Sequence, residues 1–219
     1  MNEFISQVTR NWRIAWANKR FRNIFILEII ICLILSFTTT VFFDYIESLK
    51  GGIFLNDWVL RNLPVVDVSI PIVTLEATVI FLSVLASAVN PNMAITLLMA
   101  LGFQLIFRIL SINFTRFLAP QGILELKDPI GSMLYHSKFI TRDLFYSGHT
   151  AALFIFYLFA QKKSRKYFML CATLIVAFLL LLQHVHYTVD VLCAPLFAFG
   201  CFWLSKQGIR LLNVQVNLD

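Results

Sequence analysis

Charged residues and cysteine are both scarce in this sequence. Asp, Glu, Lys and Arg make up 14% of its 219 residues, whereas a soluble domain averages about 25%, and 59% of the residues are apolar. An ordinary soluble domain is therefore excluded. The cysteines are scattered through apolar stretches without the paired spacing of zinc ligands or of a disulfide framework. We expect no bound metal, and we interpret as small core residues Cys32, Cys171, Cys193 and Cys201.

Long apolar runs are what the sequence has in abundance. Six of them approach the roughly 20 residues that an α-helix needs to cross the hydrocarbon of a bilayer. They predict an all-α polytopic membrane protein, a bundle of six transmembrane helices at 23–43, 68–88, 93–114, 148–161, 167–184 and 189–205. The fourth run has a short apolar stretch, so it spans only if Tyr146–Thr150 extends the same helix into the head-group layer.

The basic residues predict the orientation of these spans. Eleven of the eighteen Lys and Arg residues fall before the first run, in the loop 162–166 or after the last run, and short basic loops face the cytoplasm. Both termini are therefore expected in the cytoplasm, and membrane orientation explains the net charge of +6 better than nucleic-acid binding does. We expect a cytoplasmic segment at 1–22, a membrane domain at 23–208 and a cytoplasmic tail at 209–219.

The segments between the runs are consistent with this topology. The N-terminal segment lacks the apolar core and cleavage site of a signal peptide, so the first span is expected to remain as an anchor. Asn90-Pro91-Asn92 predicts a tight turn between the second and third spans. The outer loops are 44–67, with an amphipathic stretch that suits a short interfacial helix, and 115–147, which prolines and glycines interrupt, Pro129 and Gly131 among them.

Three ionisable residues converge on the outer side. His149 lies at the start of the fourth span, His186 at the end of the fifth and Asp190 at the start of the sixth. Polar residues near spans are costly and tend to mark function. His186 and Asp190 are four positions apart, so the carboxylate can orient the imidazole, and His149 adds a group that titrates near neutral pH. The set predicts a histidine nucleophile with a separate proton donor.

A structural role is the competing interpretation for each histidine. A histidine inside a bundle is more often an interhelical hydrogen-bonding residue, and we interpret His136 and His184 in that way. A transporter that uses histidine and aspartate as a proton relay is the alternative from a different functional class.

Two segments that contain the three residues resemble the signature motifs of sphingomyelin synthases, a family related to the type-2 phosphatidic acid phosphatases. They are YSGHT at 146–150 and HVHYTVDV at 184–191. A third segment, from Arg108 to Pro120, is similar to the Arg-to-Leu-Pro motif of the family, and Glu76 matches an acidic residue within the second span. The resemblance extends over about residues 43–203.

This resemblance implies a lipid phosphotransferase. His186 would attack phosphorus, Asp190 would support it, and His149 would protonate the departing lipid alcohol. The phosphohistidine would then pass phosphocholine, phosphoethanolamine or phosphoinositol from a glycerophospholipid to ceramide or to a diacylglycerol-type lipid. The reaction needs no cofactor and no metal, because two imidazoles and a carboxylate fill the roles.

Departures from the phosphatase pattern favour the synthase branch. Those enzymes carry a Ser-Arg dipeptide where this sequence has Leu179-Leu180, and their Lys-x6-Arg-Pro segment is missing. The Cys-Gly pair of the synthases is replaced by Thr141-Arg142, with Asp143 retained. A lipid phosphate or pyrophosphate phosphatase with the same three residues, and water as the acceptor, is the alternative enzyme.

The charge of the phosphate requires further groups. The candidate cations on the outer side are Arg108, Arg116 and Arg142. Tyr146 and Ser147 precede the fourth helix, whose free N–H groups suit phosphate oxygens. Glu76 lies within a span, so it can reach a head group only through a water-filled cavity. We expect a bacterial inner membrane with the site facing the periplasm, or a lumenal or extracellular site in a eukaryote; a homo-oligomer is compatible with this interpretation.

Overall fold

The computed structural model describes residues 2–128 and 139–218, so the predictions for Pro129, Gly131 and His136 lie outside the described part. Within it the chain is helical, with one isolated bridge between Ile53 and Phe117. The prediction of an all-α bundle is confirmed. The helices are α1 (Asn2–Ala17), α2 (Lys19–Ser48), α3 (Trp58–Asn62), α4 (Ser69–Val89), α5 (Pro91–Thr115), α7 (Gly148–Phe159), α8 (Lys163–Leu182) and α9 (Thr188–Leu211).

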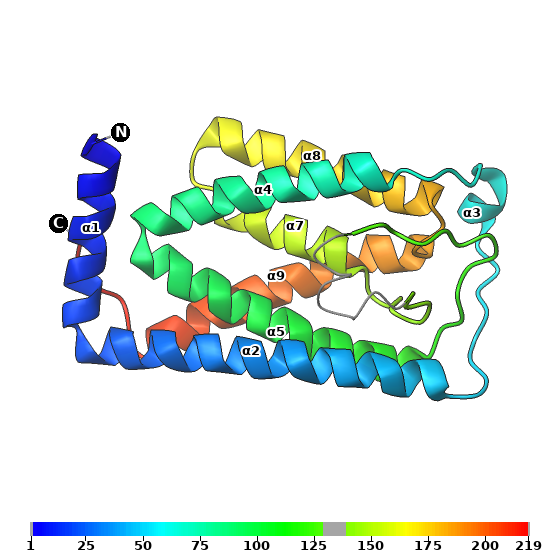
Figure 1. Cartoon of the computed structure of the whole chain (residues 1–219), viewed down its shortest axis with the longest axis horizontal. Helices are drawn as coiled ribbons and strands as arrows, with labels where there is room; N and C mark the ends of the chain where they lie inside the picture. Colours follow the sequence, from blue (N-terminus) through cyan, green and yellow to red (C-terminus); the bar gives the residue numbers. More distant parts are fainter. Residues whose placement is uncertain (1, 129–138, 219) are drawn as a thin grey trace.

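The long helices run alternately in opposite directions (Figure 1). α2, α5 and α8 lead away from the end that holds both chain termini, and α4, α7 and α9 lead back to it. We call this end the terminal end, and the opposite one, which carries α3, the loop end. α1 lies across the terminal end (Figure 1). α5, α7 and α9 pack against one another at the centre, and α2 packs on α5 from outside.

Five helices are long and apolar enough to cross a membrane: α2, α4, α5, α8 and α9. The fourth predicted span, α7, is an apolar helix of 12 residues, which is about 18 Å long at 1.5 Å per residue. It begins at Gly148 because the side chain of Ser147 caps it, so Tyr146 and Ser147 do not extend it as the span required. The described part of the chain is thus a polytopic helical bundle with five candidate spans and one shorter apolar helix.

The turn predicted at Asn90 is confirmed. Asn90 ends α4, its side chain accepts a hydrogen bond from the Met93 amide, and Pro91 occupies the first position of α5. Other boundaries differ from the prediction: α2 begins at Lys19 after an Asn18 cap, and α9 continues to Leu211. The basic residues at both junctions are thus helical.

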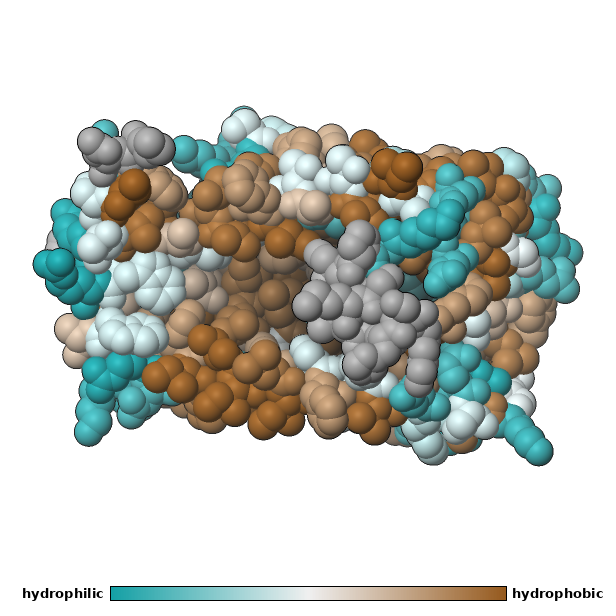
Figure 2. All heavy atoms as spheres, viewed as in Figure 1, coloured by the Kyte–Doolittle hydropathy of each residue, from teal (hydrophilic) through white to brown (hydrophobic). Residues whose placement is uncertain are grey.

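The surface pattern is that of a protein in lipid. A wide apolar surface separates polar ends (Figure 2), and many of its large apolar side chains are exposed, Phe37 and Leu196 among them. The helices differ in how far they are buried inside the protein, since 6% of the α2 span and half of the α5 span are buried. α2 therefore lies at the periphery of the bundle, and α5 lies near its centre.

Candidate functional site

The two signature motifs meet at the loop end. The backbone N–H of Ser147, just before α7, donates to the carbonyl of Asp190 in the first turn of α9 at 3.0 Å. This bond places the helix starts that carry His149 and Asp190 side by side. The three residues predicted to converge therefore lie at one end of the bundle, as the alternating topology requires (Figure 1).

His186 and Asp190 form a buried pair. Their side chains are 2% and 0% exposed, and Nδ1 of His186 lies 3.5 Å from Oδ2 of Asp190. That oxygen also accepts the Tyr187 N–H at 2.9 Å, as part of the capping box that starts α9. The separation is long for a hydrogen bond, so the carboxylate acts on the ring mainly through its charge. Because Nδ1 faces Asp190, Nε2 is the ring nitrogen left for another partner.

His149 forms a second imidazole–carboxylate pair, with Glu76 of α4. Nδ1 of His149 lies 2.7 Å from Oε1 of Glu76, and the two side chains are 29% and 13% exposed. Glu76 is seven residues into α4, or about 10 Å along it. Glu76 can contact His149 because α7 begins farther from the loop end than α4 does. The same deep start makes α7 shorter than the neighbouring helices. The pair is thus recessed from the loop end.

Arg108 of α5 holds the segment before α7. It is buried, and its guanidinium forms an ion pair with Asp143 and donates to the carbonyl of Tyr146. Gln104, one turn earlier, donates to the carbonyl of Gly148 at 3.0 Å. A Cβ on Gly148 would come within 2.7 Å of Cζ of Arg108, so a larger residue there would displace the guanidinium from Asp143 and the Tyr146 carbonyl. The contacts of Arg108 are those of a positioning residue for the SGHT segment.

Replacing Gly148 by alanine is expected to lower activity roughly tenfold or more, because the guanidinium must move and carry the start of α7 with it. Gly200→Ala is the matched control, since a Cβ there has open space in the middle of α9. Initial rates of the two purified variants measure the effect. Equal rates in both would show that the close approach of Arg108 is irrelevant.

The other predicted site residues lie in different surroundings. Tyr146 is fully buried and stacks on Phe197 with ring centroids 4.1 Å apart, and the Ser147 hydroxyl caps α7. The guanidinium of Arg142 donates to the carbonyl of Gly51 at 2.8 Å. Nε of Arg116 donates to Asn113 at the end of its own helix, and the residue is exposed. Among the hydrogen bonds and ion pairs of the described residues, none joins one of these side chains to either pair.

The residues around His186 are fixed by a buried amide. The side chain of Gln183 donates to Ser69 Oγ and to the Glu125 carbonyl, and it accepts the Val68 N–H. It thereby ties the start of α4 and the loop at 125 to the end of α8. His184 places Nδ1 2.8 Å from the Gln121 carbonyl, which agrees with the structural role expected for it.

Asp57 is a residue that the sequence analysis missed. Its carboxylate caps α3 and also accepts the N–H and the hydroxyl of Thr188, the first residue of α9. An aspartate directly before the amphipathic stretch at 58 is the signal that could have indicated an N-cap. The contact from Thr188, 131 positions away, had no such signal. Asp57 therefore joins the first outer loop to the helix that carries Asp190.

The Asp57 contacts predict a pH-dependent contribution to stability. Burial alone would raise the pKa of Asp57. The hydrogen bonds from Thr188, Leu60 and Val59 lower the pKa by more than burial raises it, so the pKa lies below its ordinary value. A carboxylate with a lowered pKa stabilises the fold above about pH 4 and loses this effect as the pH falls through the folded pKa.

Asp57→Asn is therefore expected to lower the thermal unfolding midpoint at pH 7, by the equivalent of about 1 kcal/mol, because hydrogen bonds to a charged acceptor contribute more than hydrogen bonds to a neutral one. The difference between parent and variant should narrow as the pH falls from about 4 through the folded pKa, below which the carboxylate of the folded parent is also neutral. Unfolding midpoints across this range measure it. A difference that stays constant with pH would contradict the assignment.

No group of three or more potential ligands from His, Cys, Asp and Glu is arranged to hold a metal ion among residues 2–128 and 139–218.

Comparison with known proteins finds relatives of the region that holds the two motifs. Residues 142–207 match the family model described as PAP2 superfamily C-terminal. Phosphatidylcholine:ceramide cholinephosphotransferase 1 of Gallus gallus is 43% identical over 86 residues, which cover 35% of this chain and 21% of that protein. The match thus spans about a fifth of that relative's length. Both findings confirm the predicted resemblance to the sphingomyelin synthase family, and the matched residues 142–207 include His149, His186 and Asp190.

Proposed function

We propose that this protein is a membrane lipid phosphotransferase of the sphingomyelin synthase type. It transfers a phosphorylated head group from a glycerophospholipid to ceramide or a related lipid alcohol through a phosphohistidine. The observation that carries the proposal is the pair of imidazole–carboxylate contacts, His186–Asp190 and His149–Glu76, at one end of a membrane bundle. The name of the Gallus gallus relative supports phosphatidylcholine and ceramide as the first substrates to test.

The first half of the reaction is cleavage of the donor. Nε2 of His186 attacks phosphorus, and the bond between phosphorus and the glycerol oxygen breaks. His149 gives its proton to that oxygen, so diacylglycerol leaves as a neutral alcohol. Asp190 compensates the positive charge that develops on the His186 ring, and its position next to Nδ1 leaves Nε2 as the nucleophile.

The second half transfers the head group. His149, now neutral, removes the proton from the primary hydroxyl of the acceptor, and the resulting oxygen attacks the phosphorus bound to His186. The N–P bond breaks and both histidines return to their starting states. Glu76 stabilises the protonated form of His149, which alternates between acid and base.

A lateral apolar pocket supports a lipid substrate. It has a volume of about 440 Å³, and its lining is almost entirely apolar, with Phe25 and Ile29 of α2, Ile80 of α4 and Phe156 of α7. Ile80 lies one turn after Glu76 and Phe156 two turns after His149, on the same helix faces as those residues. The lining also includes Trp12 of α1 and Ala88 at the end of α4, so an acyl chain in this pocket would lie between the histidines and the terminal end.

Product analysis tests the proposal. Purified protein in vesicles of labelled phosphatidylcholine with ceramide is expected to give phosphocholine-ceramide and diacylglycerol in equal amounts. Parallel vesicles with phosphatidylethanolamine or phosphatidylinositol identify the donor head group. Release of free phosphate or phosphocholine without a new sphingolipid would instead indicate a phosphatase-type hydrolase. No turnover of any lipid would leave the transporter alternative and contradict the proposal.

A further inference from the structure

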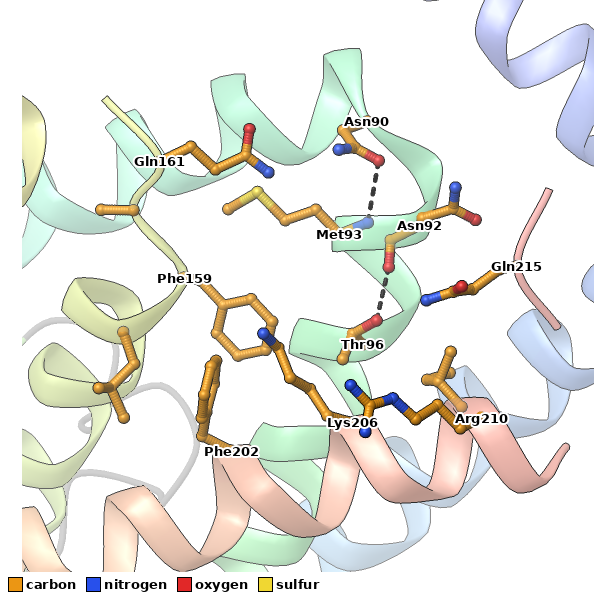
Figure 3. A pocket seen from close by; sticks show the side chains of 13 residues that line it. Asn90, Asn92, Met93, Thr96, Phe159, Gln161, Phe202, Lys206, Arg210 and Gln215 are labelled. Atoms are coloured by element: carbon orange, nitrogen blue, oxygen red, sulfur yellow. Dashed lines mark hydrogen bonds between the residues drawn. The ribbon is translucent and has the colours of Figure 1, made fainter. Parts of the chain in front are cut away.

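A polar pocket lies at the terminal end, away from the histidines. Figure 3 shows it between the start of α5, the segment after α7 and the last turns of α9. Its volume is about 300 Å³. The residues that line it are Asn90, Asn92, Met93, Thr96, Leu158, Phe159, Ala160, Gln161, Phe202, Lys206, Ile209, Arg210 and Gln215. The length of α7 separates it from His149, because His149 lies at the start of that helix and Phe159, its last residue, lines the pocket.

The pocket concentrates positive charge. Lys206 and Arg210 are one turn apart on α9, and both side chains extend into the hollow (Figure 3). Neither Asp nor Glu is among the described residues of the lining, and neither cation forms an ion pair with the described part of the chain. Nζ of Lys206 lies 4.5 Å from the centroid of the Phe202 ring, so its position is supported by a cation–π contact.

The rim is built from amides and held in place. The side chain of Asn92 forms two hydrogen bonds with the backbone of Val216, which fasten the segment after α9 to the start of α5. This attachment puts Gln215 opposite Arg210, and Gln161 lies across the pocket from both (Figure 3). Amide N–H groups and two cations are the donors that a phosphate group requires.

The floor of the pocket is apolar, with Met93, Phe159 and Phe202 among the lining residues. An apolar floor below a basic rim, at the end of helices long enough to span a membrane, matches the boundary between acyl chains and head groups. A free anion would use only the rim. A phospholipid would use both parts, and basic pockets between transmembrane helices bind anionic head groups in this way.

We propose that this pocket binds the phosphate of an anionic phospholipid from the leaflet on the terminal side. Lys206 and Arg210 contact the phosphate oxygens, Gln161 and Gln215 donate to them, and the glycerol and first methylenes lie on the apolar floor. Binding there links α5, the end of α7 and α9, the helices that carry the candidate site at their other ends. The site does not depend on the proposed transferase activity.

Native mass spectrometry of the full chain with phosphatidylglycerol, and with phosphatidylcholine as the zwitterionic reference, tests this proposal. The double variant Lys206→Gln with Arg210→Gln is expected to bind phosphatidylglycerol roughly thirtyfold more weakly, the effect of two basic residues near a charged lipid. The matched control is Lys163→Gln with Lys166→Gln, which removes the same charge at the same end but outside the pocket, where the lysines lie over Tyr167 and Tyr157. Binding to the control should stay close to that of the parent.

Three results would overturn the proposal. Equal losses in both double variants would indicate a general surface charge rather than a site. Unchanged binding in the pocket variant would show that the lipid lies elsewhere. Inorganic phosphate that binds as tightly as phosphatidylglycerol, and displaces it, would assign the pocket to a free anion instead. Because the readout is lipid binding, it is independent of whether the transfer reaction occurs.

Discussion

Replacing His186 by alanine is expected to lower head-group transfer by about three orders of magnitude or more, because the nucleophile that forms the covalent intermediate is lost. The side chain is buried beside Asp190, and its Nε2 is the nitrogen that does not face the carboxylate. The effect should be in kcat for every donor and every acceptor, since the same step precedes all of them. Initial rates with labelled phosphatidylcholine and ceramide measure it.

His184→Asn is the matched control for this variant. His184 is two residues away and has a φ of 55°, a conformation that asparagine tolerates, and its ring contacts the Gln121 carbonyl rather than Asp190. Both variants should unfold at a temperature close to that of the parent, so that their activities can be compared in the folded state. If His186→Ala retained activity while His184→Asn lost it, the assignment of the nucleophile would be wrong.

Replacing Glu76 by glutamine is expected to lower transfer from a phospholipid by about a hundredfold, the usual scale of general acid–base catalysis. Glutamine keeps the size of the side chain but removes the charge that faces His149 at 2.7 Å. A donor whose leaving group needs no proton, such as a nitrophenyl ester of phosphocholine, should be far less sensitive to this change. His186→Ala, in contrast, should lose activity with both donors.

Glu28→Gln provides the comparison for Glu76. Glu28 is also a buried acidic residue within a spanning helix, 8% exposed in α2, and it has no place in the mechanism. Its replacement should leave the ratio of the two donor activities unchanged. If Glu76→Gln reduced both donors equally, Glu76 would be a structural residue rather than a partner of the proton donor.

The spans could be predicted from the lengths of the apolar runs. The convergence of His149, His186 and Asp190 could be predicted because successive spans cross the membrane in opposite directions. Apolar length fixes how often the chain can cross a bilayer, and alternation then fixes which helix ends share a side. The turn at Asn90 was predictable for a local reason, since Asn and Pro at adjacent positions end one helix and start the next.

The contacts across the bundle could not be predicted. Whether Glu76 reaches His149 depends on how deeply α7 starts relative to α4, and hydropathy does not encode that offset. The sequence likewise gives no sign that the guanidinium of Arg108, expected to bind phosphate, contacts Asp143 and the Tyr146 carbonyl. Its direct role toward phosphate stays a prediction, as do those of Arg116 and Arg142.

The central claim is that His186 carries the head group between the two half-reactions. Protein incubated with labelled phosphatidylcholine in the absence of ceramide, quenched in alkali and digested for mass spectrometry, should contain phosphocholine on His186, and added ceramide should remove it. Turnover that proceeds with no adduct on His186, or with the adduct on His149, would contradict the mechanism.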